Sequence, residues 1–60
     1  MNELDNVILK KDFKDLKAGT KGAIVLKYNE QDFEVEFFDN QLDTIGVYTI
    51  NISYLKLDND

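Results

Sequence analysis

The segment 33–37 limits the folds open to this chain more than any other feature. Its side chains alternate between apolar and acidic, in the order Phe-Glu-Val-Glu-Phe. A period of two puts successive side chains on opposite faces of an extended chain, so the pattern predicts a strand with one buried face. The preceding run, 22–28, is mostly apolar and favours a more fully buried strand. Because 28–32 is polar and turn-like, we expect the two strands to form a hairpin.

Three more segments have the composition of strands. One is 44–50, which follows a turn at 39–41, and two short ones lie near the ends, at 7–9 and 54–56. Several short strands in a chain of 60 residues predict a small, strongly curved all-β barrel. Gly46 predicts a bulge or bend in its strand, and Gly19 predicts either a tight turn or the cap of a short helical turn begun at Asp12.

We expect a single domain over residues 1–60, with an ordered core from about residue 5 to residue 57 and a frayed tail at 58–60. The predicted core consists of Val7, Leu9, Leu16, Ile24, Leu26, Phe33, Val35, Phe37, Ile45, Val47 and Leu55.

Missing residue types exclude several functions. The chain has no cysteine and no histidine, so neither a disulfide nor a structural zinc can supplement a core of this size, and self-association stays open as a source of stability. The same absences exclude Cys–His and Ser–His nucleophile systems. No apolar run approaches the roughly 18 residues that span a membrane, and the acidic first five residues differ from a signal peptide. We therefore expect a cytoplasmic protein that is not an enzyme and binds no cofactor or membrane.

Three motifs resemble those of a known family. The segment 16–25 resembles the L-K-x-G-x-x-G-x-V-V entry to the second strand of SH3-like barrels, and 33–37 resembles the Y-x-V-E-F strand that follows. The segment 49–56 is similar to the short 3₁₀ turn and last strand, although this chain has no proline there. The order resembles small bacterial proteins of unknown function whose SH3-like barrel is akin to that of nitrile hydratase β subunits. The resemblance covers about 7–57 and implies a five-stranded SH3-like barrel with a short 3₁₀ turn before the last strand.

Charge is divided unevenly along the chain. Residues 1–27 carry a net charge of +2 and residues 28–60 a net charge of −7. Alternation places Glu34 and Glu36 on the outward face of their strand, with Phe38 on the same side. Asp39 and Asp43 lie in or beside the next turn. We take these five residues as the candidate partner-binding surface, with a solvated face that only keeps the protein soluble as the competing interpretation.

Other kinds of site fit the sequence less well. Two carboxylates on one strand have the spacing of a glycosidase pair, but so small a barrel has little room for the cleft that would raise one pKa. The segment 39–50 lacks the glycine and final glutamate of a calcium loop, so we expect no metal site. The six lysines before residue 28, with Phe13 and Tyr28 as stacking surfaces, would suit RNA, but the net charge of −5 and the absence of arginine oppose it.

The sequence therefore predicts a non-enzymatic protein-binding module that presents an acidic face to a basic partner. An immunity protein or antitoxin that covers the basic site of a toxin is one form of such a module. Two alternatives stay open: a small barrel that binds nucleic acid, and an accessory or subunit-like barrel of a larger enzyme, as the nitrile hydratase resemblance implies.

Overall fold

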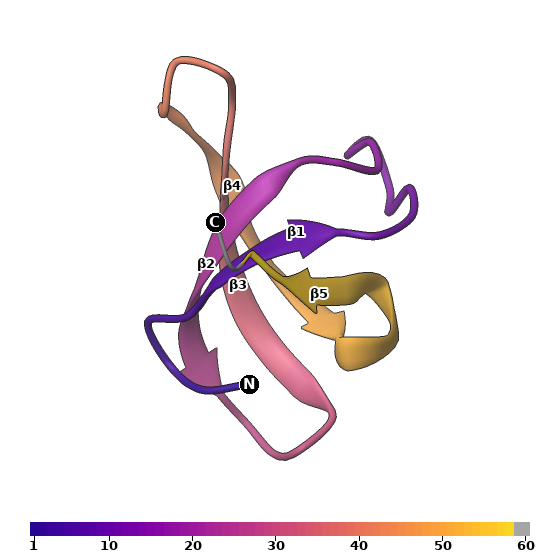
Figure 1. Cartoon of the computed structure of the whole chain (residues 1–60), viewed down its shortest axis with the longest axis vertical. Coiled ribbons are helices and arrows are strands. Elements are labelled where there is room, and N and C mark those ends of the chain that lie inside the picture. Colours follow the sequence, from indigo (N-terminus) through magenta and orange to yellow (C-terminus); the bar gives the residue numbers. More distant parts are fainter. Residues whose placement is uncertain (59–60) are drawn as a thin grey trace.

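The computed structural model describes residues 1–58, and all of its regular structure apart from one 3₁₀ turn is antiparallel sheet (Figure 1). The elements are β1 (Asn6–Leu9), β2 (Lys21–Lys27), β3 (Asp32–Phe38), β4 (Thr44–Asn51), η1 (Ile52–Tyr54) and β5 (Leu55–Leu57). The strands form one sheet in the order β4-β3-β2-β1-β5, strongly twisted into a body of 29 × 21 × 20 Å. The predicted fold class is confirmed: an all-β chain of five strands, consistent with a small barrel, with a 3₁₀ turn before the last strand.

The core forms where β3 presents its apolar side chains to its neighbours. Phe33, Val35 and Phe37 are completely buried, as the alternation predicted. Register pairs Val35 with Ile24 of β2, and residues that face each other across antiparallel strands share one face of the sheet. All of the most buried apolar side chains belong to one cluster: Val7, Leu9, Leu16, Ile24, Phe33, Val35, Phe37, Ile50 and Leu55.

Three residues predicted to be in the core are instead exposed: Leu26 by 39%, Ile45 by 45% and Val47 by 52%. In β2 the register shifts between Ile24 and Leu26, which turns Leu26 to the face opposite the core. In β4 the prediction chose the wrong alternate set, because register pairs Tyr48 with Val35 and buries Ile50 opposite Phe33.

The connection from β1 to β2 closes one end of the core with aromatic side chains. It forms turns with a bridge between Phe13 and Leu16 rather than a helix, and Gly19 takes the positive φ of 95° that was expected of a tight turn. The Phe13 ring packs edge-on against Tyr54 and Tyr48, with centroids 5.1 and 6.3 Å away. Edge-to-face rings stabilise beyond the area they bury, so this cap adds to a small core.

The ends of β4 and of the chain test two further expectations. The register shifts between Phe37 and Phe38, beside Gly46, so the bulge predicted there is confirmed. Asp58 is held rather than frayed, because its N–H donates to the Asn6 carbonyl at 2.9 Å and its carboxylate pairs with Lys21. The rest of the expected tail lies outside the described residues.

Replacing Gly22 by alanine should lower the free energy of unfolding by about 2 kcal/mol, because an added methyl group in a well-packed core forces its neighbours out of place. An added Cβ would lie 2.8 Å from the Glu36 carbonyl oxygen and 2.9 Å from Phe37 and Val35 side-chain atoms. Gly46→Ala is the matched control, since its Cβ would meet only the Tyr48 ring, at 3.1 Å. Urea unfolding of both variants measures the difference, and an equal loss would show that close approach at Gly22 is not the cause.

Candidate interaction face

The two central acidic residues lie on the face of β2, β3 and β4 that points away from the core. Register places Glu36 between Ala23 and Val47. It places Glu34 between Leu26 and Thr49. We call these six residues the outer face. The predicted common orientation of Glu34 and Glu36 agrees with this register, and their neighbours across the strands are apolar or uncharged.

Glu34 holds the phenol of Tyr28. The Tyr28 hydroxyl donates a hydrogen bond to Glu34 Oε1 at 2.9 Å. The pKa of Tyr28 is raised above its ordinary value of 10.0, first because this hydrogen bond favours the neutral phenol, and also because of desolvation and the negative charge of Glu34. Tyr28 therefore contacts the outer face through Glu34.

Glu36 is held in a similar way by a hydroxyl group of the neighbouring strand β4. The Thr44 hydroxyl donates a hydrogen bond to Glu36 Oε2 at 2.6 Å. Both glutamates are half-buried and each is oriented by one hydroxyl group. These contacts fix where the carboxylates point but leave their charge uncompensated.

No lysine within residues 1–58 forms an ion pair with either glutamate. The ion pairs in that range join Lys17 to Asp12, Lys21 to Asp58 and Lys27 to Glu30. Two negative charges therefore lie on one face of β3, directly opposite uncharged residues of β2 and β4. A cationic group from another molecule would compensate the negative charge of this surface.

The remaining candidate residues lie toward the β3–β4 hairpin. Phe38 is half-buried opposite Lys21 and Thr44, on the side predicted for it. Asp39 organises the hairpin turn: its Oδ1 accepts hydrogen bonds from the N–H groups of Gln41, at 2.8 Å, and Asp43, at 3.0 Å. Asp39 thus has a structural task that the sequence interpretation did not assign to it.

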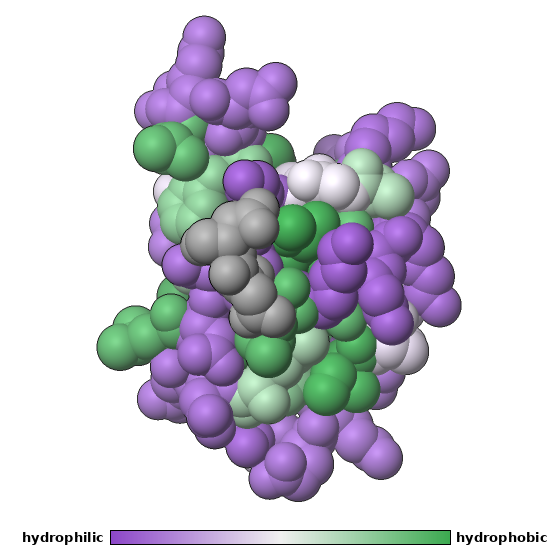
Figure 2. Space-filling view, in the orientation of Figure 1, coloured by the Kyte–Doolittle hydropathy of each residue, from purple (hydrophilic) through white to green (hydrophobic). Residues whose placement is uncertain are grey.

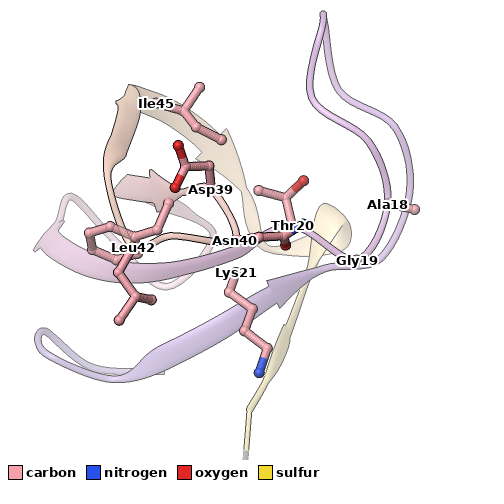
Figure 3. Close-up of a pocket in the computed structure, with 9 residues that line it drawn as sticks. Ala18, Gly19, Thr20, Lys21, Asp39, Asn40, Leu42 and Ile45 are labelled. Atoms are coloured by element: carbon pink, nitrogen blue, oxygen red, sulfur yellow. The ribbon is translucent and has the colours of Figure 1, made fainter.

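A hollow of about 530 Å³ lies between this hairpin and the β1–β2 connection (Figure 3). Phe38, Ile45 and Leu42 form part of its lining, and Leu42 is 76% exposed. Figure 2 shows hydrophobic side chains directly below the hydrophilic tip of the molecule where the hairpin lies. This hollow has both polar and apolar lining residues, and the sequence interpretation missed its exposed Ile45 because it placed that residue in the core.

The residues proposed for nucleic-acid stacking have other contacts. Phe13 packs against Tyr48 and Tyr54, and Tyr28 binds Glu34. Lys11 and Lys14 lie over the rings of Tyr54 and Phe13, at 4.4 and 5.5 Å from the ring centroids. A base that stacked on Phe13 would have to displace these contacts, whereas the Tyr28 ring is half exposed and its hydrogen bond engages only the hydroxyl.

Within 1–58 there is no group of three or more histidine, cysteine, aspartate or glutamate side chains placed to hold a metal ion. No helix in that part of the chain has the length and apolar character required to cross a bilayer.

The fold and the outer face together define a small all-β domain with an acidic and apolar surface. The sequence model of a family described as a domain of unknown function (DUF4926) matches residues 3–57, and the chain belongs to this family. No curated protein and no solved structure matches the chain. The predicted membership of an uncharacterised family is therefore confirmed, and the family description assigns no activity.

The contact between Tyr28 and Glu34 predicts a pH-dependent stability. The fold raises the pKa of this phenol, so the contact stabilises fully below the unfolded value, near pH 10, and is lost as the pH rises through the higher folded value. In Glu34→Gln the amide oxygen can still accept the bond but carries no charge, so the pKa should fall toward 10. NMR titration of the Tyr28 ring measures it, and an unchanged midpoint would contradict the role of the Glu34 charge.

The turn role of Asp39 predicts different effects for two substitutions. Asp39→Ala removes the acceptor of two backbone N–H groups and should lower the free energy of unfolding by about 1 kcal/mol. Asp39→Asn keeps an oxygen in place and should retain most of that stability. Thermal unfolding compares the two variants, and equal stability of alanine and aspartate would remove the turn role.

Proposed function

We propose that this domain is a non-enzymatic protein-binding module that uses its outer face to bind a basic protein partner in the cytoplasm. The observation that carries the proposal is the state of Glu34 and Glu36, which are oriented by hydroxyl groups but form no ion pair with the lysines of the described chain. Val47 and Leu26 beside them are exposed apolar side chains. Exposed apolar side chains contribute affinity in a complex, and complementary charges beside them contribute orientation and a higher association rate.

The proposed partner is a toxin whose basic site the domain covers, which would make the domain an immunity protein or antitoxin. A nuclease cleft is shaped to attract phosphate, and a surface of fixed carboxylates can occupy the same positive field. The motif resemblance supports a bacterial source for the chain and a relationship to the SH3-like barrels of nitrile hydratase β subunits.

Reversing the charge of Glu34 and Glu36 to lysine should weaken the complex by at least about 100-fold, because unlike charges that face each other would become like charges. The control is Asp15→Lys with Glu30→Lys, which changes net charge equally at exposed positions off the outer face. Circular dichroism verifies the fold, and the affinity for a partner captured with the natural protein is then measured by calorimetry.

Three results would overturn this proposal. In the first, the reversal of Glu34 and Glu36 leaves the affinity unchanged. In the second, the control variant loses as much affinity as the reversal. In the third, the captured ligand is RNA or single-stranded DNA, whose binding falls steeply with salt, and the nucleic-acid alternative replaces the proposal.

A further inference from the structure

The free edge of β4 is long and carries no charged side chain. β4 is one outer strand of the sheet, and its eight residues, Thr44–Asn51, include no charged side chain and no proline. The opposite edge, β5, has three residues with Lys56 at its centre. Short edges that carry lysine resist pairing with another chain, whereas a long uncharged edge favours it. The two edges of this sheet therefore differ in their capacity to accept a further strand.

The register shows which backbone groups point out of the β4 edge. Ile24 accepts from the Leu4 N–H and donates to the Asp5 carbonyl, so its backbone groups face away from β3. Since Ile24 pairs with Val35, the groups of Val35 face β4, where Val35 pairs with Tyr48. Alternation then points the N–H and C=O groups of Val47 and Thr49 away from the sheet.

These outward groups have no other partner within the described residues. The hydrogen bonds made outside the strand ladders do not involve the backbone of Val47 or Thr49. Both residues also belong to the outer face, opposite Glu36 and Glu34. The unpaired backbone groups and the uncompensated carboxylates therefore occupy neighbouring rows of the same sheet.

We propose that an extended segment of the basic partner adds to the sheet as a sixth strand along β4, with basic side chains at every second position. This inference rests on the proposed function and specifies how the partner is held. The added strand would lie about 4.8 Å from β4 and twice that from β3, so a long cationic side chain crosses the short Val47 or Thr49 to reach a glutamate.

The other side chains of the added strand would face the opposite side of the sheet. There Gly46 has no side chain and the Tyr48 ring is half-buried. Apolar residues suit these positions, so the segment alternates basic with apolar residues and is the chemical complement of β3. A second copy of this chain fits less well, since its β4 is uncharged and its net charge of −5 would leave both pairs of glutamates uncompensated.

The test uses labelled ten-residue peptides and the whole chain. In the first peptide lysine alternates with valine and threonine; in the second glutamate replaces lysine; the third is the first with alternate backbone amides N-methylated, which keeps the charge but blocks strand pairing. Fluorescence anisotropy should show binding of the first peptide, at least tenfold weaker binding of the third, and none of the second. On binding the first peptide, hydrogen exchange at the amides of Val47 and Thr49 should slow at least tenfold.

Variants of the protein provide the second arm. Val47→Pro removes an N–H that the β3–β4 pairing does not use, so the fold should persist while binding falls at least tenfold. Val47→Thr keeps the N–H and should bind as the natural chain does. If Val47→Pro unfolds the domain, the methylated peptide still decides the question on the natural protein.

Several results would overturn the added strand. If the methylated peptide binds equally well, or if folded Val47→Pro binds fully, the peptide binds by charge alone and adds no strand. The proposed function would then stand. Failure of the first peptide to bind would remove this occupant, and the charge-reversal experiment on the captured partner would then decide the proposed function separately. Protection of Val47 and Thr49 amides that rises with protein concentration in the absence of peptide would assign the edge to a second copy.

Discussion

The pairing of β3 with strands on both sides is the constraint on which the rest of the structure depends. One set of β3 side chains, Phe33, Val35 and Phe37, is fully buried, and the intervening glutamates project from the other face. The alternation of the strand thus separates the molecule into an apolar interior and a charged exterior. A shift of one residue would exchange the two sets and bury carboxylates, so the register is strongly specified by the sequence itself.

That separation explains which parts of the structure could be predicted. In β3 the apolar and acidic sets differ so clearly that only one of them can face the core, the set of Phe33, Val35 and Phe37. The segment 44–50 offers no such contrast, because Ile45 and Val47 are as apolar as Ile50. The register with β3 decides which alternate residues of this segment face the core, and that register is a nonlocal property. The position of Leu26 depends on a bulge in β2. The bulge shifts the alternation by one residue, but the residues at 23–26 are all apolar, so the shift cannot be seen in the sequence.

The candidate site was predictable to a similar degree. The common face of Glu34 and Glu36 follows from alternation alone, as does the side on which Phe38 lies. These carboxylates form no ion pair with the described lysines. That absence depends on the positions of the lysine side chains in the folded chain, which alternation does not predict. The turn contacts of Asp39 likewise needed the hairpin geometry, although aspartate at the start of a turn commonly binds backbone N–H groups.

The contact between Tyr28 and Glu34 also gives the molecule an optical property. The chain has no tryptophan, so its tyrosines dominate its near-ultraviolet spectrum. Tyr28 is half exposed and hydrogen-bonded to one of the two outer-face carboxylates, whereas Tyr48 and Tyr54 belong to the aromatic packing around Phe13. The protein thus carries an intrinsic chromophore at the acidic surface, and a molecule that engages Glu34 alters the surroundings of that ring without any attached label.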